Sequence, residues 1–137
     1  MKIGLNATCF NSRPSGAKQR FFGIYSRLIK KLKRHEFFIF HSNEYNIKKE
    51  FGRFTNARYV KIDIPVNNSF KKNIIYFYKF RKVISNYNLD IIEIFNLPFF
   101  IPKDLQYLIT IHDIRNNYFE YSGIKSIFAK IILKFFL

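Results

Sequence analysis

Two side chains with catalytic potential, His112 and Asp113, directly follow an apolar run in the last third of the chain. The run, residues 107–111, is typical of a buried strand, and in open α/β sheets ligands bind outside the carboxyl ends of the strands. A neutral imidazole both donates and accepts hydrogen bonds, so His112 is suited to holding a ligand hydroxyl or stabilising charge that develops during a reaction. The alternative is a buried strand-end histidine with a purely structural role. Strand alternation points Asp113 to the opposite side, where it either orients a ligand or caps the following turn.

A second group of candidates lies where the first predicted strand and its loop lead into a helix. The backbone N–H groups of Gly16 and Ala17, with the helix dipole, are suited to holding an anion such as a phosphate, although an ordinary loop glycine fits the same local sequence. Arg20 can bind a phosphate or a carboxylate bidentately, whereas we expect Lys18 to be a solvated surface lysine. Asn96, at the end of the fourth predicted strand, is a further candidate for substrate contact.

The elements that must position these residues alternate between strand and helix. Apolar runs bounded by turn residues predict strands, and apolar residues at helical spacing predict helices. The predicted strands cover residues 2–10, 37–42, 57–65, 90–96 and 106–113, and the predicted helices cover 18–34, roughly 70–87 and a segment after Ser122.

Most of these strands are apolar on both faces, which is typical of a parallel sheet covered by helices. We therefore predict an α/β fold, a Rossmann-like parallel sheet of about five strands with helices on both faces, in a single domain over residues 1–137. The sheet should be ordered around the first strand, with residues 107–112 near its centre. No G-x-G-x-x-G sequence follows the first strand, which argues against a nicotinamide or flavin enzyme.

The composition is strongly basic, with 24 Lys and Arg against 9 Asp and Glu and a net charge of +15. Such a charge suits nucleic acid or an anionic membrane surface. The lysines are spread out, however, and the chain is rich in residues that AT-rich codons encode, so we expect no nucleic-acid partner. The one cysteine, Cys9, has no partner for a disulfide or a metal site and is expected in a strand of the buried core. Without a signal peptide or an apolar stretch of ~20 residues, the sequence indicates a cytoplasmic location.

Three stretches together resemble the N-terminal domain of the retaining glycosyltransferases of the GT-B fold, family four. The opening strand runs through PSGAKQRFF into a helix, with Gly16 and Arg20 at positions that match the family. The stretch LDIIEIFNLPFFIP, residues 89–102, is similar to a family strand that reads roughly D-I-I-H-x-x-N. The stretch YLITIHDI is similar to the family's strand end T-I-H-D-L. The chain departs from the family at Ala17 and Gln19, where glycine is common, and at Glu93, where histidine is common.

The resemblance implies the acceptor-side half of an enzyme that transfers a sugar from a nucleotide-sugar donor to a glycan or lipid-linked acceptor in cell-surface polysaccharide synthesis. It assigns a catalytic role to His112 and substrate contacts to Gly16, Ala17, Arg20, Asn96 and Asp113, with no metal and no cofactor. The donor-binding C-terminal domain is not recognisable in the 137 residues, so we expect the chain alone to be inactive. Lysines beside the apolar stripe of the C-terminal helix suit an anionic membrane surface, which suggests a peripheral place on its inner face. The alternative from another class is a non-enzymatic Rossmann-like module that contacts nucleic acid or anionic membrane through its basic surface.

Overall fold

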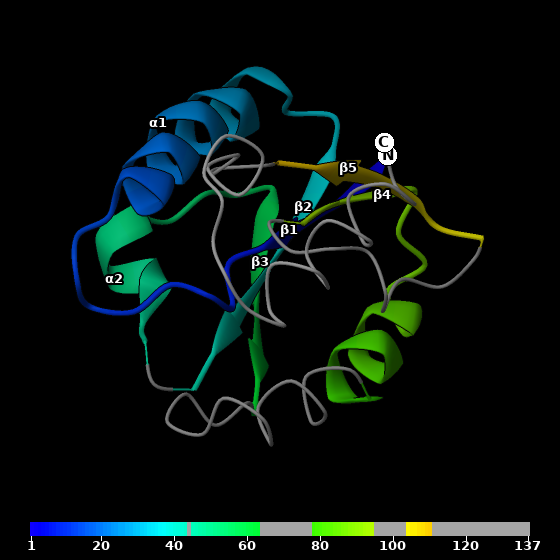
Figure 1. The fold of residues 1–137 in the computed structure, drawn as a ribbon. Helices are drawn as coiled ribbons and strands as arrows, with labels where there is room; N and C mark the ends of the chain where they lie inside the picture. Colours follow the sequence, from blue (N-terminus) through cyan, green and yellow to red (C-terminus); the bar gives the residue numbers. More distant parts are fainter. Residues whose placement is uncertain (44, 64–77, 95–103, 111–137) are drawn as a thin grey trace, which may run out of the picture.

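The chain folds around a five-stranded sheet in which every strand runs parallel to its neighbours (Figure 1). The computed structural model of the protein describes residues 1–43, 45–63, 78–94 and 104–110. The strands are β1 (Lys2–Asn6), β2 (Glu36–Ser42), β3 (Ala57–Ile62), β4 (Ile91–Ile94) and β5 (Gln106–Ile109), and they lie in the order β3-β2-β1-β4-β5. The predicted α/β class and the parallel sheet ordered around the first strand are confirmed.

The sheet is buried on both faces, as the apolar strands predicted. In β2, the four residues from Phe37 to Phe40 are all buried, and successive side chains enter opposite faces. Phe37 and Ile39 pack in one core cluster with the helix that follows β1, and Phe38 and Phe40 pack in the other. A strand covered on one face only would have alternated apolar and polar residues.

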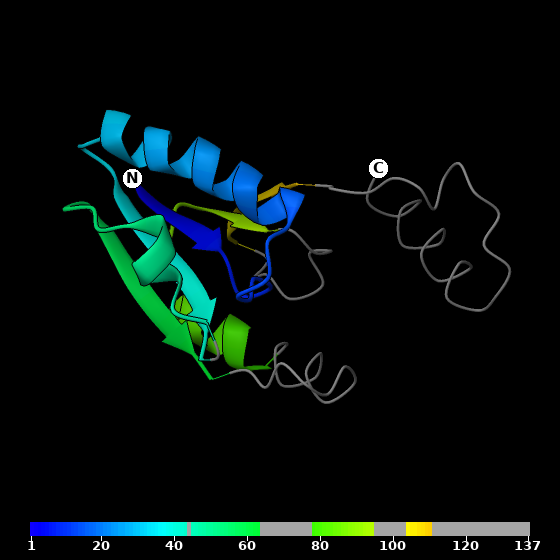
Figure 2. The same ribbon diagram turned by 90° about the vertical axis from the view of Figure 1, so that its left-hand side faces the viewer.

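Helices cover both faces of the sheet (Figure 2). On one face lies α1 (Gly16–Lys31), whose buried residues Phe21, Tyr25 and Ile29 recur every four positions and so form one apolar stripe. On the other face, residues 78–85 are helical and contribute Phe80 and Ile84 to the second core cluster.

The short helix α2 (Ile47–Phe51) packs beside α1 and was not expected from the sequence. Its five residues are too few to show helical periodicity. It ends at Gly52, whose φ of 100° lies in the left-handed region that glycine adopts without strain. The Phe51 ring lies 5.5 Å from the Phe21 ring of α1, centroid to centroid, so aromatic packing holds the two helices together.

Two expectations about the strands are wrong. The first strand ends at Asn6 rather than at residue 10, so Cys9 lies in the loop after it and is exposed rather than buried. Within the described sheet β5 is the outermost strand, not a central one, because the chain crosses from β3 past β1 to form β4 and then adds β5 outside it. Leu108 of β5 is accordingly 54% exposed although its sequence context suggested a core strand. The predicted C-terminal helix and the first part of the predicted helix 70–87 lie outside the described residues.

Candidate functional site

The polar side chains that the described structure buries are concentrated at one edge of the sheet. Each lies in the last two residues of a strand or in the loop and first helical turn after it. They are Asn6, Thr8, Lys18, Ser42 and Glu93. Burying a polar group costs free energy unless it is paired, so their shared position at the carboxyl edge calls for a specific reason.

This edge includes the topological switch point of the sheet. From β1 the chain continues first to β2 and β3 on one side, and later to β4 and β5 on the other. In open parallel sheets, ligands bind outside the carboxyl ends of the two strands that flank such a point. In the register of the sheet, Leu5 of β1 lies opposite Glu93 of β4, so Glu93 stands at the carboxyl ends of the two strands that flank the switch point.

Glu93 is the central polar residue at the switch point. It is only 3% exposed although it lies in an otherwise apolar strand. Its Oε1 accepts a hydrogen bond of 2.6 Å from the Thr110 hydroxyl and lies 3.7 Å from the Arg20 guanidinium. Its Oε2 is buried and has no hydrogen-bond partner in the part of the chain that the structure describes. Thr110 thus engages one oxygen, whereas the other makes no hydrogen bond of ordinary length and angle within the described residues.

Tyr25 of α1 completes the surroundings of this carboxylate. Its pKa is raised, first by burial and then by its interaction with the adjacent Glu93 carboxylate, while the charge of Arg20 lowers it. Tyr25 therefore remains a neutral phenol beside an acidic neighbour. Together, one helix and two strands supply a carboxylate, a guanidinium, a phenol and a hydroxyl, the last from Thr110 just after β5.

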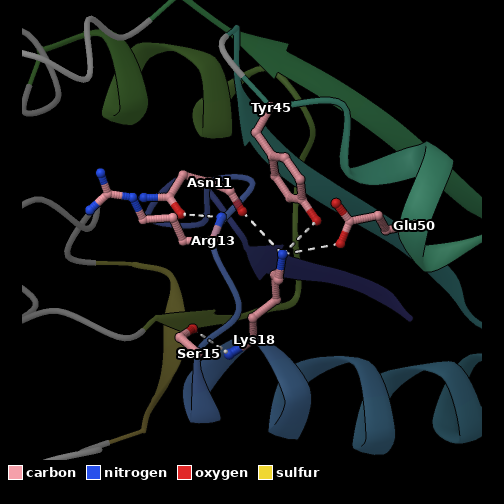
Figure 3. A network of polar contacts seen from close by, with 6 residues as sticks. All are labelled: Asn11, Arg13, Ser15, Lys18, Tyr45 and Glu50. Atoms are coloured by element: carbon pink, nitrogen blue, oxygen red, sulfur yellow. Dashed lines mark hydrogen bonds and ion pairs between the residues drawn. The ribbon is translucent and has the colours of Figure 1, made fainter.

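A second polar cluster surrounds Lys18 in the first turn of α1 (Figure 3). The Lys18 ammonium donates hydrogen bonds to the backbone oxygen of Asn11 at 3.1 Å, to the Tyr45 hydroxyl at 3.3 Å and to the Glu50 carboxylate at 3.0 Å. These three bonds use all the N–H donors of the ammonium. Lys18 is 6% exposed, so the expectation of a solvated surface lysine is wrong. The lysine instead ties the loop after β1 and the start of α1 to α2.

Charge and burial in this cluster shift the pKa values of the two side chains that bind the lysine, Tyr45 and Glu50. Burial, with the hydrogen bond and charge of Glu50, raises the pKa of Tyr45. Hydrogen bonds from Tyr45 and then from Lys18 lower the pKa of the Glu50 carboxyl. At neutral pH Glu50 is therefore a carboxylate and Tyr45 a neutral phenol, and the bonds of the cluster are structural.

The loop between β1 and α1 is shaped by its own side chains. The Asn6 side-chain oxygen accepts bonds from the Thr8 backbone N–H at 3.1 Å and from the Thr8 hydroxyl at 2.7 Å. At the far end of the loop, Ser15 caps α1 by accepting a bond from the Lys18 backbone N–H at 3.2 Å. Gly16 is exposed, and a Cβ added there would meet nothing within 4 Å, so the space beside the start of α1 is open.

The structure brings together part of the predicted site. Gly16, Ala17 and Arg20 share the first turns of α1 beside the switch point, as expected. Arg20 faces a carboxylate of the protein itself, which was not expected. The other three predicted site residues, Asn96, His112 and Asp113, lie outside the described residues.

Sequence reasoning missed the roles of Glu93, Thr110 and the Lys18 cluster. One signal was available for Glu93: a single acidic residue within the run Ile91–Ile94 conflicts with a strand buried on both faces. No comparable signal marked Lys18, because its three partners come from separate segments of the chain.

Within the described residues, no cluster of three or more His, Cys, Asp or Glu side chains could hold a metal ion. Over the same residues, no helix has the length and apolar character needed to cross a membrane. No protein-family model matches the chain, and neither the curated proteins nor the solved structures contain a significant match to it.

Proposed function

We propose that this chain is the acceptor-side domain of a glycosyltransferase that moves a sugar from a nucleotide-sugar donor to a glycan or lipid-linked acceptor. The observation that carries the proposal is the polar cluster of Glu93, Arg20 and Thr110 at the switch point of a parallel sheet. Hydrogen-bond donors and acceptors placed together at the carboxyl ends of neighbouring strands are suited to a ligand rich in hydroxyl groups. The family resemblance of the three sequence stretches points to the same chemistry.

In this proposal a partner domain binds the nucleotide-sugar donor in the cleft between the two domains. His112 acts at the reacting centre. Gly16 and Ala17 supply backbone N–H groups near the donor phosphates, and Asn96 and Asp113 contact the substrate. The reaction needs no metal cofactor, and it takes place at the cytoplasmic face of a membrane where a lipid-linked acceptor is available. The basic charge of the chain supports such a peripheral location.

A binding experiment on the whole chain tests this function. We expect saturable binding of methyl hexosides or of a lipid-linked disaccharide, with NMR shift changes centred on the carboxyl ends of β1 and β4. A 20-base oligonucleotide serves as the comparison ligand. Oligonucleotide binding with a steep salt dependence, and no binding of any saccharide, would contradict the proposal and favour a basic binding module instead.

The role of His112 needs an activity measurement in a chain that carries both domains. When residues 1–137 are joined to a matching donor-binding domain, His112→Ala should lower turnover strongly while the far-UV circular dichroism spectrum stays unchanged. Turnover equal to that of the unmodified enzyme would assign His112 a structural role.

A further inference from the structure

Among the buried polar groups of the described chain, Glu93 offers unused hydrogen-bonding capacity at the point where a ligand is expected. The Lys18 ammonium has its three donors engaged by the protein, and the Asn6 side chain is engaged with Thr8. Glu93 presents a buried Oε2 with no hydrogen-bond partner among the described residues, as does the Ser42 hydroxyl at the end of β2. Of the two, Glu93 is the one at the switch point, where Arg20 and Tyr25 adjoin it. An acceptor left in this state costs free energy, which a ligand that donates to it would recover.

We infer that Glu93 Oε2 accepts a hydrogen bond from a hydroxyl group of a polyhydroxylated ligand bound at the switch point. If the proposed function is right, this ligand is a sugar residue of the acceptor, so the sugar identity rests on that function. The binding position itself rests only on the geometry of Glu93 and its neighbours.

The charges around Glu93 favour a neutral ligand over a phosphate. Arg20 is the cation beside the carboxylate, and at 3.7 Å its positive charge is balanced by Glu93. A phosphate placed against this pair would meet the carboxylate as a like charge in a poorly solvated site. A sugar hydroxyl carries no net charge and donates one hydrogen bond while accepting another. It can therefore donate to Oε2 and accept from the guanidinium.

Arg20 is the partly exposed neighbour of the buried carboxylate. Its side chain is 41% exposed, whereas Glu93 is 3% exposed. The distance of 3.7 Å between them is longer than a hydrogen bond, so the guanidinium is not locked onto the carboxylate. The inferred binding therefore requires the Arg20 side chain to move aside from the carboxylate.

Three substitutions at and beside this position test the inference. Glu93→Met removes both oxygens at similar volume, and we expect it to weaken binding of methyl hexosides to the whole chain by about tenfold or more. Glu93→Gln should retain part of the affinity, because a hydroxyl can accept a bond from the new amide. Arg20→Gln, at a partly exposed position, should weaken binding without leaving a cavity in the core. Thermal unfolding of each variant confirms that it is folded.

The chain contains a matched control for both members of the pair. Arg58 and Glu36 form an ion pair of similar length, 3.8 Å, at the amino ends of β2 and β3, far along the strands from the switch point. Glu36→Gln and Arg58→Gln should therefore leave binding unchanged. A weakening equal to that of the Glu93 and Arg20 variants would show that only the overall charge matters, and would overturn the inference.

Other outcomes separate the inference from the proposed function. Hexoside binding that Glu93→Met leaves intact overturns the inference and preserves the function. A loss as large with Glu93→Gln as with Glu93→Met would show that binding depends on the charge of the carboxylate and not on a hydrogen-bond acceptor at this position, which also overturns the inference. If no saccharide binds, the function fails, and a titration with myo-inositol decides the inference. Shifts at the Glu93 and Thr110 amides that vanish in Glu93→Met support it, and no shifts overturn it.

Discussion

Replacing Lys18 by methionine tests the structure most directly, because the sequence predicted a solvated lysine and the structure buries it. Methionine keeps the apolar stem of the side chain and removes the ammonium. The Asn11 carbonyl and the Tyr45 hydroxyl then lose their partner, and hydrogen bonds to a charged donor are worth roughly 1.5–3 kcal/mol each. The ion pair with Glu50 adds little, since the Glu50 side chain is 43% exposed and water screens the pair.

One effect opposes this loss. The variant no longer has to remove an ammonium from water, and that desolvation costs several kcal/mol for a buried ion. Subtracting it, we expect Lys18→Met to lower the free energy of unfolding by about 1–3 kcal/mol. Equilibrium urea unfolding at neutral pH, followed by far-UV circular dichroism and tyrosine fluorescence, measures this change.

Lys33→Met is the matched control, because Lys33 is exposed just after α1. Its free energy of unfolding should stay within about 0.5 kcal/mol of the unmodified chain. If Lys18→Met behaves like Lys33→Met, the ammonium of Lys18 is solvated, and the arrangement of the loop, α1 and α2 described above is incorrect.

Four further predictions concern stability. Gly4→Ala should destabilise the chain by about 1–3 kcal/mol, because the added Cβ would lie 2.7 Å from Leu89 Cδ1. Gly23→Ala should stabilise the chain by up to about 1 kcal/mol, since a Cβ added at this exposed position inside α1 would meet nothing within 4 Å. Urea unfolding measures both changes, and a change in the free energy of unfolding with the same sign for both variants would contradict the packing. Burial raises the pKa of Tyr59 from 10.0 to about 12, so the unfolded phenol ionises first and stability should fall as the pH rises between these values. The urea midpoint should fall less steeply there in Tyr59→Phe, and an identical slope would refute the assignment. The pKa of Glu50 is lowered from 4.5, so its contribution is present above that pH and is lost as the pH falls through the lower folded value. Glu50→Gln should therefore show a weaker loss of stability in acid, and an unchanged acid transition would contradict the contact.

The sequence by itself determined the fold class and most of the elements. Doubly apolar runs such as residues 37–40 indicate parallel strands covered on both faces, because only a strand without a solvent face can dispense with polar residues. The apolar spacing of Phe21, Tyr25 and Ile29 indicates the face of α1 that packs on the sheet. These signals are local: each depends on neighbours within a few positions along the chain.

Only the tertiary structure decided the position of β5 and the partners of the buried charges. Strand order depends on which side each crossover takes, and the apolar character of residues 107–109 is the same at the centre and at the edge. Lys18 is buried because Asn11, Tyr45 and Glu50 meet it from three segments, and Glu93 meets Arg20 from a distant helix. A charge enters the interior only when partners are already placed around it, and folding alone places partners that lie so far apart in the chain.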